Sequence, residues 1–202
     1  TATYKGSLSV QGQVIPMDLT RTVKDTAGSW VVTEATVMPM MSVSDVATIE
    51  KGTLQVRKRA IQQGPASIEV AFANNKASGK MTMNGQERPI TADLGGSLFA
   101  DGAGAPDVIA TLPLAEGYTT SYRNFDLMGQ KVKLRQLKVA GSEKVVVPAG
   151  SFDAWKVEIT PADGGSGEST TLWVDKASRR VVKMSTVIPE MNGAIATAEL
   201  VK

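Results

Sequence analysis

The sequence contains no cysteine and no histidine among its 202 residues. The absence of cysteine excludes disulfides, thiolate nucleophiles and thiolate metal ligands. The absence of histidine removes the most frequent general base, the most frequent metal ligand and the usual partner of a nucleophilic serine. We therefore predict no cofactor, no metal site and no enzymatic activity.

Long apolar runs and a strong net charge are also missing. No stretch approaches the roughly 18 apolar residues that a membrane span requires, so no transmembrane segment is predicted. The 22 basic and 20 acidic residues nearly cancel, which argues against nucleic acid as a partner. The densest basic run is Arg57-Lys58-Arg59, and on a strand we expect Arg57 and Arg59 to share a solvated face with Gln55.

The length suits one all-β domain, and we expect residues 1–202 to form a single domain. The chain begins at Thr1 rather than at a methionine. We interpret it as a piece that was excised from, or processed out of, a longer precursor, so the absence of a signal peptide does not indicate the cytoplasm.

Period-two alternation dominates what is present. Leu8 and Val10 alternate with polar neighbours, and Trp155, Val157 and Ile159 alternate with charged ones. This pattern is typical of antiparallel strands with one face on a core. The sequence predicts a mainly β protein, built as a single curved antiparallel sheet or an open half-barrel with one or two short helices.

Turn signals separate the predicted strands. Asn84-Gly85 predicts a hairpin because both central residues of a type I′ turn need positive φ, and residues 175–178 predict another. The apolar parity slips between Leu134 and Val139, which predicts a β-bulge there.

Two segments favour short helices. Pro106 can begin a helix over residues 107–112. A helical turn after Ser44 is a second candidate, although Val46 and Ile49 fit a strand almost as well.

The methionines Met38, Met40 and Met41 gather in one short segment. Methionine fills irregular gaps in cores or at sheet edges, and this is the simplest interpretation. A copper(I) site is a weak alternative, because it would need cysteine or histidine beside the thioethers. The third interpretation is an adaptable apolar lip over a lipid-like ligand, and we carry these three residues forward as candidate ligand contacts.

Three aromatic residues complete the candidate ligand-binding set. Tyr118 and Tyr122 share a face if their segment is a strand, where they either pack in the core or line a cavity. Trp155 falls on the face opposite Phe152, and we expect one of the two to pack in the core and the other to face a concave surface.

The carboxylates that come nearest to inward-facing strand or turn positions are Glu34, Asp45, Glu50, Asp126 and Asp153. Acid–base chemistry without histidine would need two of them. Such an enzyme would require the two groups to converge in a cleft. The thin scatter of aromatic residues argues against a sugar-binding cleft.

Three segments together resemble a known family. LPLAEGYTTSYRNFD (112–126), KVAGSEKVVVPAGSFDAWKVEI (138–159) and LWVDKASRRVVKMS (172–185) resemble a domain of unknown function that is common in bacterial envelope proteins. This family looks related to the lipoprotein-sorting fold, an open antiparallel half-barrel that wraps a helix or an apolar ligand.

The resemblance implies a periplasmic or otherwise exported protein. We expect a non-catalytic envelope β-domain that binds a lipid or a lipoprotein acyl chain on the concave face of its sheet. The alternative is an accessory C-terminal domain of a secreted, peptidase-like hydrolase encoded in the same chain.

Overall fold

A computed structural model describes residues 1–165 and 167–202 of this protein. Extended strands make up most of the chain, as the alternation predicts. The strands are β1 (Ala2–Val10), β2 (Gln13–Thr26), β3 (Ser29–Met38), β4 (Met41–Glu50), β5 (Val56–Gln63), β6 (Ala66–Ala73), β7 (Lys76–Met83), β8 (Gln86–Asp93), β9 (Thr119–Asp126), β10 (Lys131–Val147), β11 (Gly150–Pro161), β12 (Ser169–Asp175), β13 (Val181–Ile188) and β14 (Ala194–Leu200).

Helical structure is confined to short pieces. The 3-10 helix η1 (Gly102–Gly104) runs into α1 (Ala105–Ala110), and η2 (Pro189–Met191) precedes β14. The helix expected over residues 107–112 exists but begins and ends earlier, because Pro106 occupies its first turn rather than preceding it. The helical alternative after Ser44 is wrong, since the segment belongs to β4. No helix among the described residues is long and apolar enough to cross a membrane.

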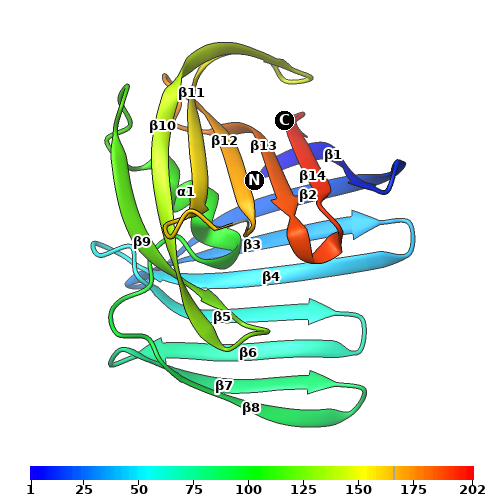
Figure 1. The fold of residues 1–202 in the computed structure, drawn as a ribbon, viewed down its shortest axis with the longest axis vertical. Helices are drawn as coiled ribbons and strands as arrows, with labels where there is room; N and C mark the ends of the chain where they lie inside the picture. The colour runs from blue at the N-terminus through cyan, green and yellow to red at the C-terminus, as the bar shows by residue number, and fades with distance from the viewer. Residues whose placement is uncertain (166) are drawn as a thin grey trace. The chain divides into compact units, whose positions relative to one another are not determined.

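The strands form one antiparallel sheet that does not close (Figure 1). Their order is β8-β7-β6-β5-β4-β3-β2-β1-β14-β13-β12-β11-β10-β9. The pairings are antiparallel. They join strands that are consecutive in the sequence, except that β1 pairs with β14. The prediction of a mainly β chain on one open antiparallel sheet with short helices is confirmed.

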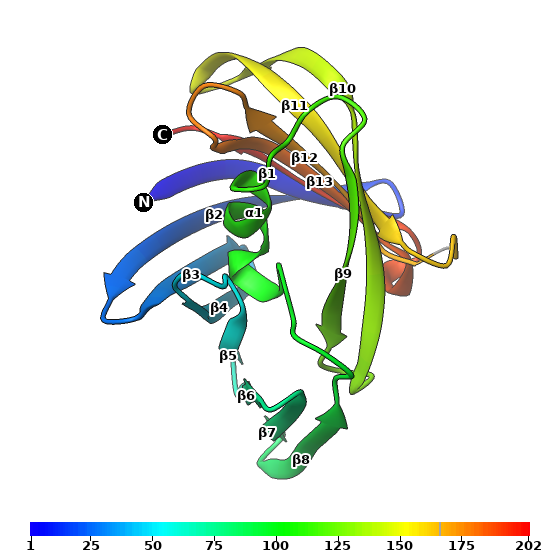
Figure 2. The ribbon, with the colours of Figure 1, turned by 90° about the vertical axis from the view of Figure 1, so that its left-hand side faces the viewer.

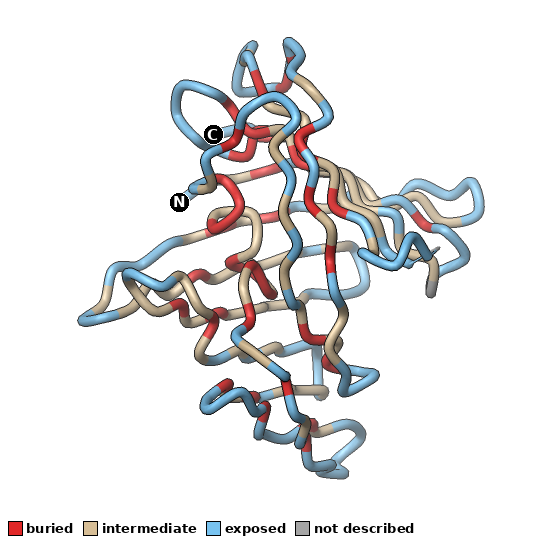
Figure 3. The backbone as a smooth tube through the Cα atoms, turned by 60° about the vertical axis from the view of Figure 1, so that its left-hand side comes forward, coloured by how far each residue is buried: buried red, intermediate tan, exposed pale blue. Residues whose placement is uncertain are grey.

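The hairpins follow the turn residues. Asn84 and Gly85 have φ values of 51° and 75° between β7 and β8, as a type I′ turn requires. Residues 175–178 join β12 to β13, also as predicted. The bulge is real but lies at Ala140, where the register shifts between Val139 and Gly141, and not within residues 134–139. Exposed positions gather at these turns (Figure 3).

Contacts divide the chain into two compact units. The first unit comprises Thr1, Thr20–Val108 and Arg123–Lys133. The second unit comprises Ala2–Leu19, Ile109–Tyr122 and Leu134–Lys202. Each unit has its own apolar core and is described by itself.

The core of the first unit lies on one face of β5 to β8. The buried side chains of this cluster are Val56, Val70, Phe72, Ala77, Met81, Ile90, Leu94, Leu98, Phe125 and Leu127. Phe72 and Phe125 meet edge to face with ring centroids 5.8 Å apart, the arrangement that aromatic quadrupoles favour. The chain that leaves β8 then runs beside the sheet toward η1 (Figure 2).

The core of the second unit gathers side chains from β1, β2, β10, β11, β13 and β14. Its buried members are Tyr4, Leu19, Val145, Val147, Ala154, Val182, Ala198 and Leu200. The Tyr4 hydroxyl donates a hydrogen bond of 2.9 Å to the Val181 carbonyl, which satisfies the polar end of a buried ring. Phe152 packs against this core, whereas Trp155 lies on the face of β11 that carries the buried Val157 and Ile159.

Candidate functional site

One face of the first unit's sheet carries its core, and we call it the covered face. It is the face on which Val32, Ala47, Val70 and Ile90 lie, all of them buried. The η1 segment lies against this face, because a Cβ on Gly104 would overlap the Ile49 side chain. A side chain at position 104 would require the end of the Ile49 side chain to move.

Toward the hairpin end of β3 to β8, the covered face becomes more exposed, and its apolar side chains lie beside Gln63 and Gln86. We call this part the methionine strip. Its members are Met38, Met41, Val43, Ile61, Ile68 and Met83. The strand register places them together, because Met38 lies opposite Met41 and Ile61 lies opposite Ile68. Met41 and Met83 remain 38% and 42% exposed.

The methionine strip is continuous with the core. Ile61 and Ile68 are half-buried and pack against the core cluster. Ile68 is also the cross-strand partner of Met81, a core member. The exposed fraction of the apolar side chains on the covered face therefore increases from the core to Met83.

A buried ion network lies beside the strip on the same face. Arg59 on β5 donates two hydrogen bonds to Asp45 Oδ2 on β4, at 3.1 Å from Nε and 2.8 Å from Nη2. Its Nη1 lies 3.2 Å from Asp101 Oδ1. Asp101 also accepts hydrogen bonds from the Asn124 side chain at 3.0 Å and from the Phe125 amide at 3.1 Å. The network thus attaches the segment before η1 to the sheet.

A second buried arginine, Arg21 on β2, attaches α1 to the sheet. Arg21 is 3% exposed and forms an ion pair with Glu34 on β3. Its Nε lies 3.7 Å from the Asp107 carboxylate in α1. Because an unpaired charge is costly to bury, each arginine and its carboxylates must stay together in the folded chain.

Burial shifts the pKa values of this network. Removal from water raises the pKa of Asp101, against the opposing attraction of Arg59 and the Phe125 amide. Burial likewise raises the pKa of Asp107. The repulsion of Glu34 also raises this pKa, whereas the attraction of Arg21 lowers it. The attraction of Asp101 and Asp45 raises the pKa of Arg59 although burial acts to lower it.

This charge arrangement corrects one prediction from the sequence. Arg57 and Arg59 do not share a solvated face, because the register shift between β4 and β5 leaves Arg57 as the extra residue. Arg59 lies in the buried network, whereas Arg57 donates a 2.6 Å hydrogen bond to Glu50.

Of the five candidate carboxylates, the structure brings Glu34 and Asp45 together, and an arginine forms an ion pair with each of them. Glu34 on β3 lies directly opposite Asp45 on β4 on the covered face, whereas the register places Glu50 on the other face. Within the described part of the chain, no group of three carboxylates is arranged to hold a metal ion. The network is suited to fastening the η1 segment, and the strip beside it is suited to apolar contacts.

The structure brings some of the predicted ligand contacts together. Met38 and Met41 are direct cross-strand partners, and Met41 accepts a hydrogen bond from the Gln63 amide. Met40, at the tip of the hairpin, is 97% exposed. These three methionines all belong to the first unit, and their role as ligand contacts stays a prediction.

The aromatic candidates belong to the second unit. Tyr118 precedes β9, and its carbonyl accepts a 2.8 Å hydrogen bond from the Val139 amide. Tyr122 is half-buried within β9. The Lys176 ammonium lies 4.1 Å from the centroid of the Trp155 ring, a cation–π geometry. Their role in ligand binding likewise stays a prediction.

Sequence reasoning missed Ile61 and Ile68 as members of the site. The register that opposes them was not visible, although the alternation of Ile68 with Ser67 and Glu69 was a usable signal. The η1 segment was also missed, since the helix predicted over residues 107–112 begins after it, yet Ala103 and Gly104 are buried.

Comparison with known proteins gives one family. A family model described as "Protein of unknown function (DUF3108)" matches residues 3–201. No protein with a curated description matches the chain.

Three solved structures show a distant likeness. A "putative lipoprotein" from Parabacteroides distasonis has a TM-score of 0.33 at 12% identity, with 100% of this chain and 94% of that chain covered. A "putative exported protein" with a YmcC-like fold from Bacteroides fragilis has a TM-score of 0.32 at 11% identity, with 99% and 93% covered. A DUF1329 family protein from Desulfovibrio piger has a TM-score of 0.31 at 12% identity, with 99% and 84% covered.

Proposed function

We propose that this chain, which belongs to the family described as "Protein of unknown function (DUF3108)", holds the acyl chain of a lipid or lipoprotein on its methionine strip. The protein acts without catalysis, as a carrier or receptor of an apolar ligand in the bacterial envelope. The envelope location belongs to the proposal and rests on the resemblance of the sequence motifs.

The observation that supports this function is the gradient of burial along the covered face. A protein core ordinarily ends in a polar boundary, but here the core surface continues outward through Ile61 and Ile68 to the exposed Met41 and Met83. Exposed apolar patches that continue from a core are typical of binding sites. Methionine is unbranched and polarizable, so it adapts to a flexible chain of variable length.

The strip also has polar groups at its edge, as a lipid site requires. Arg88 on β8 is exposed and lies opposite Met81 on the covered face. Its guanidinium is placed to bind a carboxylate or phosphate headgroup while the acyl chain lies on the strip. The covered-face carboxylates Glu34 and Asp45 lie on β3 and β4, several strands from β8, and are paired with Arg21 and Arg59, so they do not repel such a headgroup strongly.

Titration with cis-parinaric acid, a fluorescent fatty acid, tests the proposal. We expect Met41→Gln with Met83→Gln to weaken binding about tenfold, because each change makes an apolar contact polar. The matched control is Val37→Gln, an exposed apolar position on the opposite face of the same hairpin, which should bind like the parent chain. Equal binding by all variants, or no binding by the parent after delipidation, would refute the proposal.

The headgroup contact has its own readout. Arg88→Gln should weaken binding of the fatty acid but leave binding of the corresponding fatty alcohol unchanged. The accessory-domain alternative is tested by the gene, since it requires an open reading frame that continues upstream into a hydrolase.

A further inference from the structure

Three hairpins of the first unit reach the same end of their strands and carry no charge. Residues 36–44, 60–68 and 81–86 contain no lysine, arginine, aspartate or glutamate, although 21% of the whole chain is charged. These segments form the β3–β4, β5–β6 and β7–β8 turns with the adjoining strand ends. Because the strands are antiparallel, alternate turns lie at one edge, which we call the uncharged end.

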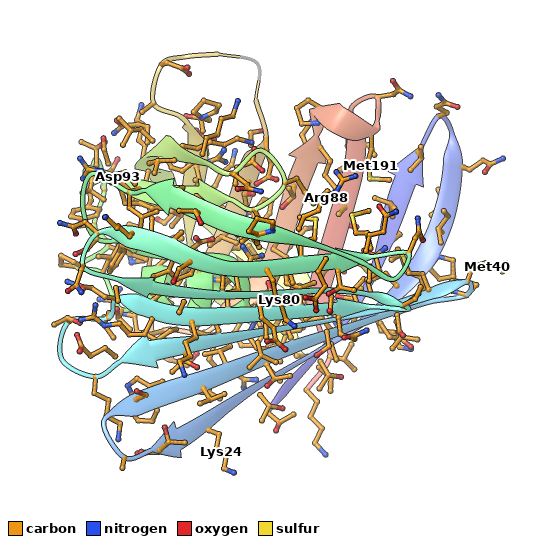
Figure 4. The ribbon with its side chains drawn as sticks, turned by 90° about the horizontal axis from the view of Figure 1, so that it is seen from below. Lys24, Met40, Lys80, Arg88, Asp93 and Met191 are labelled. Atoms are coloured by element: carbon orange, nitrogen blue, oxygen red, sulfur yellow. The ribbon has the colours of Figure 1, made fainter. Side chains whose placement is uncertain are left out.

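The opposite end of the same strands is charged. Lys24 and Asp25 lie beside the β2–β3 turn, Glu50 and Lys51 lie at the β4–β5 turn, and Asp93 ends β8. Figure 4 shows Met40 at one end of the strands, with Lys24 and Asp93 toward the other. Charge is therefore segregated along the strand direction within this unit.

The uncharged end also exposes large apolar side chains. Met40 is 97% exposed at the β3–β4 turn, next to Pro39, and Val37 is 55% exposed. Met83, at the β7–β8 turn, is 42% exposed. Exposed apolar groups concentrated at one edge mark an interaction surface rather than the scattered apolar residues of an ordinary protein surface.

We propose that the uncharged end docks onto the surface of a lipid bilayer, with Met40 and Val37 inserted among the acyl chains. The composition favours a bilayer over a protein partner. The three segments carry no charged side chain, so their insertion places no costly charge in the hydrocarbon layer. They also lack the tryptophan, tyrosine and arginine that form most hot spots of protein interfaces.

The position of the nearest cations agrees with this geometry. Arg88 lies two residues from Gln86 at the β7–β8 turn, which is about 7 Å along a strand. Apolar faces of interfacial segments insert roughly 5–10 Å into the boundary between headgroups and acyl chains. The Arg88 guanidinium would then lie at the level of anionic headgroups while the turn enters the apolar layer.

The second unit contains a hairpin of the same composition. Residues 6–17 around the β1–β2 turn carry no charge, and Val14 there is 68% exposed. This hairpin is an independent case of an uncharged turn with an exposed apolar side chain.

Docking makes the bilayer the source of the acyl chain that the methionine strip holds. In this respect the inference rests on the proposed function. The uncharged end adjoins the methionine strip, because Met38, Met41 and Met83 belong to both. An acyl chain drawn from the bilayer could thus reach the strip without crossing a charged surface.

Site-directed labelling tests docking directly, and the absence of native cysteine permits a single label. Met40→Cys and Ala27→Cys place an NBD fluorophore on exposed turns at opposite ends of the same strands. With vesicles of phosphatidylethanolamine and phosphatidylglycerol, we expect blue-shifted, enhanced emission from position 40 and unchanged emission from position 27. No change at position 40, or equal changes at both positions, would overturn the proposal.

A second pair of variants measures the strength of docking by vesicle flotation. Met40→Glu should weaken binding about tenfold, the equivalent of one buried methionine side chain, whereas Met40→Leu and Ala27→Glu should bind normally. Emission from position 40 that shifts with protein concentration alone would indicate contact between copies and refute bilayer docking. Binding of free cis-parinaric acid without vesicle binding would retain the carrier function and overturn docking.

Discussion

At the scale of single residues, Arg59 has a large predicted effect on stability. It is the shared counter-ion of Asp45 and Asp101, and the Asp101 side chain is 1% exposed. Arg59→Met leaves both carboxylates buried without that partner, which should cost about 3 kcal/mol at neutral pH. Urea denaturation of the variant and the parent measures this loss.

The loss should depend on pH with a definite sign. Burial already raises the pKa of Asp101 above its usual 3.8, and removal of Arg59 raises that pKa further. A carboxyl group with a raised folded-state pKa binds a proton more readily in the folded chain, so folding gains stability as the pH falls through that value. The difference between Arg59→Met and the parent should therefore be smaller at about pH 5.5 than at about pH 7.5.

Arg57→Met is the matched control for this pH effect. Hydrogen bonds from Thr53 and Arg57 lower the pKa of Glu50 below 4.5. Stability from that interaction is complete above 4.5 and is lost only as the pH falls through the lowered value. The effect of Arg57→Met should thus be the same at both pH values, and a matching decrease in both variants would contradict the assignment.

The contrast between Arg57 and Arg59 also shows where sequence reasoning stops at this scale. Strict alternation places both arginines on one face, and the sequence supplies no mark of the extra residue in β5. A bulge depends on the pairing of two strands, which a single strand's pattern does not encode. The Asn84-Gly85 turn, by contrast, was predictable because positive φ is a local requirement of the residues themselves.

At the scale of elements, two glycines set how closely neighbouring elements approach. A Cβ on Gly79 would overlap the Glu69 carbonyl oxygen and lie 2.7 Å from the Val70 Cα, so β6 and β7 would have to separate. Gly79→Ala should cost about 2–3 kcal/mol. A Cβ on Gly104 meets only the end of the Ile49 side chain, which can change rotamer, and Gly104→Ala should cost about 1 kcal/mol.

Thermal or urea unfolding of the two glycine variants measures this order. Ser78→Ala, an exposed neighbour of Gly79, is the control and should stay within about 0.5 kcal/mol of the parent. If Gly104→Ala is the more damaging change, then the η1 segment, and not the strand spacing, is the more rigid contact.

The elements themselves were predicted unevenly. Strands and hairpins follow from alternation and turn residues, both of which are local. The η1 segment was not predicted, because its helical turn is fixed by tertiary contacts, namely the Gly104 approach to β4 and the attachment of Asp101 to Arg59. Membership of the methionine strip depends in the same way on register between strands.

At the scale of the whole molecule, the sequence predicted the open antiparallel sheet and the family. The motifs at 112–126, 138–159 and 172–185 indicated a domain of unknown function, and the family match confirms this. The composition of the two units was not predictable, because, apart from the single residue Thr1, the chain changes unit at residues 19–20, 108–109, 122–123 and 133–134. Such interleaving is a property of long-range contacts rather than of any segment.

This interleaving predicts that the first unit cannot be isolated by truncation. A chain of residues 1–108 retains β3 to β8 and η1 but lacks Arg123–Lys133. It therefore loses Phe125 and Leu127 from the core and the Asn124 and Phe125 partners of Asp101. We expect this fragment to show no cooperative urea transition and poor dispersion of its amide NMR resonances.

A substitution in the full chain separates the loss of core from the loss of connectivity. Phe125→Ala should cost about 3–5 kcal/mol, because it removes a buried ring that meets Phe72 edge to face. The full chain should still unfold cooperatively, since both units and all four crossings are intact. If residues 1–108 fold cooperatively while Phe125→Ala is nearly neutral, then the segment 123–133 is an addition to a complete core, and the assignment of Phe125 and Leu127 to that core is wrong.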